Sequence, residues 1–154
     1  MTRQSVSLIG APTDCGASTT GARMAPDALR VAGVAKAIRR FGIDVRDCGN
    51  IDGPANPQQP PVDGFRHLPE VLAWNRAVHD VVHNELQSGR LPILLGGDHS
   101  LSIGSISAVA RYCRDQRRKL RVLWFDAHAD FNTATLTPSG NLHGMPVACL
   151  CGRG

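Results

Sequence analysis

The sequence has little that would place the chain in a membrane or in an oxidising compartment. Among its 154 residues no apolar run approaches the length of a membrane span, and the N-terminus, MTRQSVSLIGAP, lacks the apolar core of a secretory signal. The five cysteines are odd in number and form no CxxC pair. These absences predict a cytoplasmic protein with free thiols and no membrane association.

The chain also has few aromatic residues and a low net charge. Aromatic residues make up 5% of the chain, charged residues 19%, and the net charge is only +4. The densest basic stretch, RYCRDQRRKLR at 111–121, has no aromatic side chains spaced along it to stack on bases. We interpret it as a solvated helix end, where cations favour the helix dipole, and expect no nucleic-acid partner.

Strand-like and helix-like patterns alternate along the chain, which is long enough for one domain. Two apolar runs, LPILL and RVLWF, do not alternate with polar residues, which is typical of a parallel sheet covered on both faces. The Gly- and Pro-rich stretch 49–64 is predicted to be a surface loop. The fold class predicted is α/β, with helices on both faces of a parallel sheet. Strands are predicted at 5–10, 43–49, 91–95 and 121–125, and helices at 25–41, 68–88 and 101–116.

Metal-ligand side chains follow two of these predicted strands. His99 stands in GGDHS after the first, and Asp126, His128 and Asp130 stand in DAHAD after the second. A right-handed crossover would bring the two strand ends about 5 Å apart as neighbours, or about 10 Å apart with one strand between them. The four side chains would then meet at the carboxyl edge of the sheet, where open α/β folds bind ligands. Nitrogen and oxygen donors without thiolate suit Mn, Fe, Co, Ni or Zn.

The same cluster is short of negative charge for two ions. Two divalent ions carry four positive charges, whereas Asp126 and Asp130 supply two negative ones. Asp98 adjoins His99, but we expect it to orient the loop. The sequence therefore predicts an incomplete two-metal site.

Three other motifs are weaker. HDVVH places His79 and His83 at helical i, i+4 spacing, but Asp80 stands where a metalloprotease has its glutamate base, and the intervening valines favour a core-facing helix. GASTTG lacks the GK[ST] of a phosphate-binding loop. Cys149 and Cys151 are too few to define a ligand set.

Three motifs together resemble the ureohydrolase family, and most of all the N-terminal half of an arginase. They are GGDHS (96–100), DAHADFN (126–132) and SGNLHGMP (139–146), and the resemblance extends over essentially the whole chain. It implies an arginase-like three-layer α/β fold that is incomplete at the C-terminus, with residues 1–154 as the N-terminal part of a single domain. The family's later Asp-x-Asp pair and its downstream glutamate have no counterpart here.

The resemblance also implies roles for individual residues. Asp126 would bridge two Mn(II) ions, one held with His99 and Asp130 and the other with His128. Asp130 would in addition accept a hydrogen bond from the bridging hydroxide, and His143 would protonate the leaving amine. The substrate-binding residues implied are Asn132, Thr137, Ser139 and His143.

The reaction implied is hydrolysis of L-arginine to L-ornithine and urea through a binuclear manganese hydroxide. Two alternatives stay open: an agmatinase or another guanidino-compound ureohydrolase, and a non-catalytic metal-binding or assembly fragment. For the complete protein the resemblance implies a homo-oligomer, a trimer or a hexamer. We expect the 154-residue chain alone to bind manganese weakly, to release little urea and to be marginally stable, because a truncated sheet exposes an apolar edge.

Overall fold

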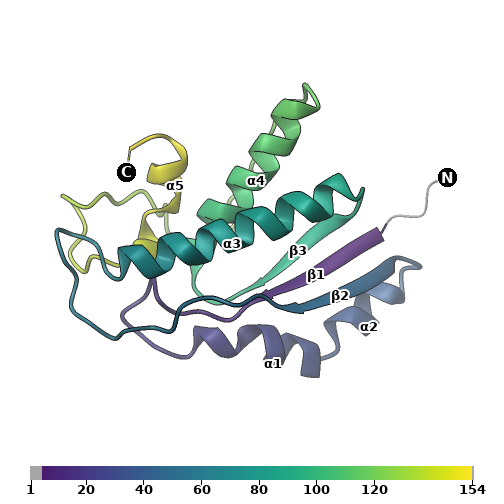
Figure 1. The fold of residues 1–154 in the computed structure, drawn as a ribbon, viewed down its shortest axis with the longest axis horizontal. Coiled ribbons are helices and arrows are strands. Elements are labelled where there is room, and N and C mark those ends of the chain that lie inside the picture. Colours follow the sequence, from purple (N-terminus) through teal and green to yellow (C-terminus); the bar gives the residue numbers. More distant parts are fainter. Residues whose placement is uncertain (1–4, 154) are drawn as a thin grey trace.

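A three-stranded parallel sheet forms the centre of the protein (Figure 1). The computed structural model describes residues 5–153, so the first four residues of the N-terminal segment MTRQSVSLIGAP lie outside the described part. The strand order is β2-β1-β3, with β1 at Ser5–Ala11, β2 at Asp44–Asn50 and β3 at Leu91–Gly96. Three of the four predicted strands are therefore confirmed.

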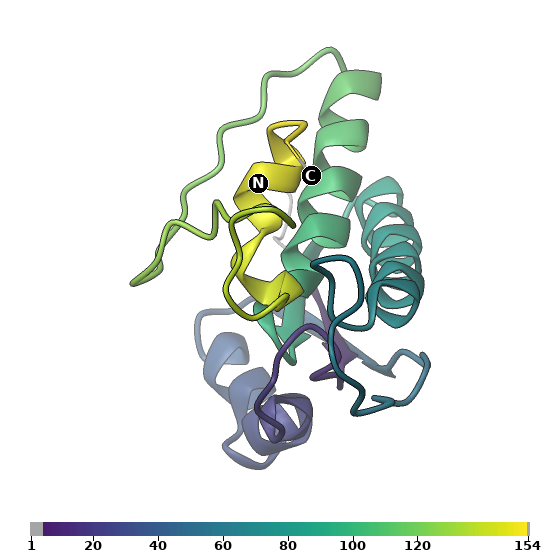
Figure 2. The same ribbon diagram turned by 90° about the vertical axis from the view of Figure 1, so that its left-hand side faces the viewer.

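Helices cover both faces of this sheet, as predicted (Figures 1 and 2). One face carries α1 (Ala25–Val31) and α2 (Val34–Arg39), and the other carries α3 (Leu68–Gln87) and α4 (Ser102–Asp115). The three-layer parallel α/β arrangement is confirmed. Three 3-10 helices and one short α-helix complete the described elements: η1 (Ala22–Met24), η2 (His99–Leu101), η3 (Leu142–Gly144) and, last in the chain order, α5 (Pro146–Leu150).

The alternation of side chains along β1 divides the core into two clusters. Val6 and Leu8 pack with Val45 and Leu95 beneath α2, and Leu8 is completely buried. Ile9 points to the opposite face and joins the larger cluster, which also contains Val71, Trp74, Val78, Val82 and Leu101. Because successive side chains of a strand point to opposite faces, β1 supplies both cores.

The prediction of one continuous helix at 25–41 is wrong, because this segment forms two helices, α1 and α2. Gly33 lies between α1 and α2 with φ of 84°, a left-handed conformation that ends the first helix and caps the second. The pattern of apolar residues continues across the break, so periodicity did not reveal it.

The strand predicted at 121–125 is not formed, and this prediction was wrong. No β-ladder includes these residues in the described chain, and the segment runs extended on the outside of the molecule (Figure 2). Leu123 and Phe125 are 70% and 92% exposed. A strand requires neighbouring strands to satisfy its backbone groups, and the described residues provide none beside this segment.

The structure describes both the helices and the cysteines on which the expected cellular compartment depends. Within residues 5–153 no helix has both the length and the apolar character needed to cross a membrane. All five cysteines are free, as predicted.

Candidate metal centre

His99 is presented by a tight turn that follows β3. Asp98 caps η2: its Oδ1 accepts a hydrogen bond from the Ser100 backbone N–H at 2.9 Å. Its Oδ2 accepts another from the backbone N–H of Gly16, also at 2.9 Å. Asp98 is 7% exposed, so both bonds are shielded from water. The prediction that Asp98 orients the loop is confirmed.

Gly97 allows this turn to approach the loop after β1. A Cβ atom at position 97 would lie 1.7 Å from the Thr13 carbonyl oxygen, a backbone atom. We expect Gly97→Ala to cost roughly 1–3 kcal/mol of unfolding free energy through overpacking, and to weaken metal binding by displacing His99. Chemical denaturation and a metal titration measure the two effects.

Gly96→Ala is the matched control for that substitution. A Cβ at position 96 meets only Leu101 Cδ1, at 3.8 Å, which is ordinary van der Waals contact. It should change stability by less than about 0.5 kcal/mol. Equal losses in the two variants would contradict the role given to the close approach at Gly97.

The side chains of His99, Asp126 and Asp130 converge on one point. His99 Nδ1 lies 2.9 Å from Asp126 Oδ2 and 2.9 Å from Asp130 Oδ2. One ligand atom from each residue lies within 4.8 Å of the others, and no other group of three or more His, Cys, Asp or Glu side chains does so in residues 5–153. The predicted meeting of residue 99 with residues 126 and 130 is present, although only His99 follows a strand, whereas the two aspartates lie on a loop outside the sheet.

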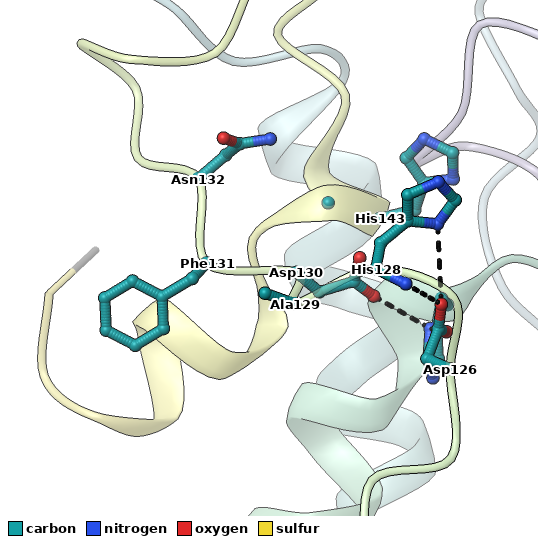
Figure 3. A pocket seen from close by; sticks show the side chains of 9 residues that line it. Asp126, His128, Ala129, Asp130, Phe131, Asn132 and His143 are labelled. Carbon is teal, nitrogen blue, oxygen red and sulfur yellow. Dashed lines mark hydrogen bonds and ion pairs between the residues drawn. The ribbon is translucent and has the colours of Figure 1, made fainter.

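His128 stands beside the same carboxylate from the other side (Figure 3). Its Nδ1 is 3.5 Å from Asp126 Oδ1, and its ring is 83% exposed. Asp126 thus directs one oxygen toward each imidazole, which is the orientation that a bridging carboxylate requires. The His128 backbone N–H, which donates to Asp126 Oδ1 at 2.8 Å, and then the charge of His99 hold the pKa of Asp126 below its usual value. The carboxylate is therefore ionised at neutral pH.

Backbone contacts hold the loop that carries these aspartates. Asp130 has φ of 46°, in the left-handed region, and its carbonyl accepts from the Val147 N–H at 3.0 Å. Asn132 N–H donates to the Gly144 carbonyl, also at 3.0 Å. Trp124 stacks on the His99 ring, with centroids 4.5 Å apart. The sequence pattern does not predict this contact, because the pattern places Trp124 in a strand.

An open cavity of about 490 Å³ lies over this cluster (Figure 3). Six of the predicted site residues line it, together with three that the sequence did not single out, Ala129, Phe131 and Gly144. The six are His99, Asp126, His128, Asp130, Asn132 and His143. Thr137 and Ser139 are not among its lining residues, and their hydroxyl oxygens accept backbone N–H groups of the turn at 139–141. Their substrate roles stay predictions.

The donor set fits a divalent transition metal. One imidazole and two carboxylates meet at the point of convergence, and a second imidazole, that of His128, faces the other oxygen of Asp126. Such a mixture of nitrogen and oxygen donors is typical of Mn, Fe, Co, Ni and Zn sites. Burial raises the pKa of the buried Cys15 thiol and of the partly buried Cys149 thiol, so both stay protonated at neutral pH. His79 and His83 lie elsewhere, on α3, with rings stacked 5.9 Å apart.

Comparison with known proteins gives a consistent set of relatives. The sequence model of the arginase family matches residues 4–154. The arginase of Brucella melitensis is 42% identical over 147 residues, which are 95% of this chain and 48% of that protein. Bacillus caldovelox arginase superposes with a TM-score of 0.87 at 39% identity, over 97% of this chain and 49% of that one. Entamoeba histolytica arginase, solved in complex with L-ornithine, gives a TM-score of 0.85 at 34% identity, over 97% and 50%. The chain spans about half the length of the curated relatives it matches.

Proposed function

The chain belongs to the arginase family, and from that premise we propose that its cavity is one half of an arginase-type active site. The reaction proposed is hydrolysis of L-arginine to L-ornithine and urea. The observation that supports it most is the convergence of His99, Asp126 and Asp130 within 4.8 Å. The relative that was solved with L-ornithine supports arginine as the substrate, since ornithine is the product of that reaction.

The metal proposed is Mn²⁺, with two ions in a complete site. His99, Asp126 and Asp130 would hold one ion, and Asp126 and His128 would hold the other. A divalent ion in such a site supplies Lewis acidity and makes water a nucleophile near neutral pH. The depressed pKa of Asp126 supports the proposal, because a metal ligand must be deprotonated.

This chain alone would hold those ions weakly. Asp126 and Asp130 offset only two of four positive charges, and the remaining oxygen ligands would come from a segment that the 154 residues do not contain. We propose that these residues form the first part of a single α/β domain. The family resemblance supports a homo-oligomer for the complete protein, and the free cysteines support the cytoplasmic location that we propose.

His143 is proposed as the proton carrier, and Asn132 as a reader of the substrate α-carboxylate. Both line the cavity beside the metal ligands. An imidazole exchanges protons near neutral pH, and a neutral amide can bind a carboxylate without a salt bridge. Thr137 and Ser139 belong to the same loop and are proposed to assist Asn132.

Urea release tests the proposal. We expect the 154-residue chain with added Mn²⁺ to release almost no urea from L-arginine, because its site lacks ligands. A chimera of residues 1–154 followed by the second half of Bacillus caldovelox arginase should release urea in a manganese-dependent way. In that chimera His143→Asn should lower kcat by roughly 10²–10⁴-fold, the usual contribution of a general acid.

The same urea-release assay is run with agmatine in place of L-arginine, so that the two substrates can be compared. Hydrolysis of agmatine in preference to arginine by the chimera would overturn the substrate assignment. Strong manganese-dependent urea release by the 154-residue chain would overturn the proposed shortage of ligands. A folded, metal-loaded chimera without activity on either compound would contradict the proposed reaction.

A further inference from the structure

Arg66 lies on the loop before α3, outside the cavity lining, yet it is bonded to the turn that carries His143. Its Nε donates to Asn141 Oδ1 at 2.9 Å, and its backbone N–H donates to the Gly140 carbonyl at 2.8 Å. Its Nη1 donates to the Gln59 carbonyl at 2.9 Å, which fixes the guanidinium from the other side. Arg66 therefore links two loops that are more than seventy residues apart in the sequence.

This contact decides which way the Asn141 amide faces. A guanidinium can only donate hydrogen bonds, so the atom of Asn141 that meets Arg66 must be the oxygen. The amide nitrogen is then turned to the opposite side, where it donates to Ser18 Oγ at 3.0 Å and lies 3.5 Å from His143 Nε2. Asn141 is only 8% exposed, so water offers little competition for these bonds.

The orientation of Asn141 has a consequence for the His143 ring. An amide NH₂ group can only donate, so Nε2 of His143 must act as the acceptor in this contact. A neutral imidazole whose Nε2 accepts carries its proton on Nδ1. The contact is long, so it biases the two tautomers of the ring without locking one of them.

We propose that Arg66 is a positioning residue that acts through Asn141 to keep His143 Nε2 unprotonated, with the ring proton on Nδ1. The functional meaning rests on the proposed role of His143 as a proton carrier, since the tautomer determines which ring nitrogen can take up a proton. The tautomer itself can be measured without metal, substrate or turnover.

Long-range ¹H–¹⁵N NMR of the ¹⁵N-labelled 154-residue chain tests the proposal. At about pH 8.5, well above the ordinary histidine pKa, His143 should be mainly the Nδ1–H form in the wild-type chain. In Arg66→Met the amide can rotate, and the ratio of tautomers should move toward Nε2–H by roughly fivefold, the factor that corresponds to one ordinary hydrogen bond. Arg23→Met, which removes an exposed arginine of η1, should leave the ratio unchanged.

Asn141→Asp provides a second variant that leaves Arg66 in place. A carboxylate oxygen would then face His143 Nε2 and could only accept, so the ring should become mainly Nε2–H. A wild-type ring that is already Nε2–H would overturn the proposal, and so would a tautomer ratio in Arg66→Met equal to that of the wild type and of Arg23→Met. If the ratios shift as expected but His143→Asn leaves the chimera fully active, the positioning role stands and the catalytic role of His143 fails.

Discussion

Replacing Asp126 with asparagine is expected to abolish most of the metal binding of this chain. Asp126 places one oxygen 2.9 Å from His99 Nδ1 and the other 3.5 Å from His128 Nδ1, so a single substitution removes a donor from both halves of the site. It also removes half of the negative charge of the cluster. Because the loss of an outer-shell partner already weakens metal binding by about 10–100-fold, the loss of this ligand should weaken it by roughly 100-fold or more.

Titration with Co²⁺ measures this effect, since Co²⁺ binds a given site more tightly than Mn²⁺ does and reports by its visible absorption. The matched control is Asp52→Asn, which removes the same charge from an exposed loop residue outside the metal cavity. Cobalt affinity within about threefold of the wild type in Asp126→Asn would show that the cluster is not the metal site. The same loss in both variants would mean that only net charge was measured.

Truncating Leu8 to alanine is expected to cause the largest loss of stability. Leu8 is completely buried in the middle strand, where it packs against Val45 and Leu95. Removing a buried leucine side chain costs about 2–5 kcal/mol, the sum of lost transfer energy and the cavity left behind. We expect the total stability of this chain to lie at the low end of the usual range of about 5–15 kcal/mol, because the sheet described for residues 5–153 has three strands and the apolar segment 121–125 is exposed.

A large fraction of Leu8→Ala should therefore be unfolded at 37 °C, as measured by circular dichroism and by the midpoint of a urea titration. Leu136→Ala is the matched control, since Leu136 is 73% exposed and its truncation should cost less than about 0.5 kcal/mol. Cooperative melting of the wild-type chain at high temperature as a monomer would contradict the expected marginal stability. A loss below about 1 kcal/mol in Leu8→Ala would contradict the importance of this core.

The segment 121–125 has the apolar pattern of a strand, yet the strand predicted from that pattern is not formed. Its apolar side chains have the composition of a buried strand, but within residues 5–153 no neighbouring strand pairs with its backbone groups. Asp126, which follows this segment, nevertheless lies beside His99, and Trp124 stacks on the His99 imidazole. The meeting of His99 with Asp126 and Asp130 was therefore predicted correctly, although the strand expected to position the aspartates is not formed.

The sequence by itself determined the properties that depend on local pattern. Apolar patterns and helical periodicity predicted four parallel strands with helices on both faces, and three of these strands are formed. The placement of GGDHS and DAHAD after two predicted strands predicted that His99 would meet Asp126 and Asp130. These inferences succeeded because burial on two faces and the chemistry of imidazole and carboxylate are encoded within a few residues. The same motifs carried the resemblance to the family that the comparisons then showed.

Only the tertiary structure decided the features that depend on distant partners. The break at Gly33 requires a left-handed conformation that periodicity does not reveal. Residues 121–125 lie outside the sheet, which in the described part of the chain has no strand beside them. The bond from Arg66 to Asn141 joins loops that no sequence pattern relates. A hydrogen bond is set by the position of both partners, and folding alone brings these together.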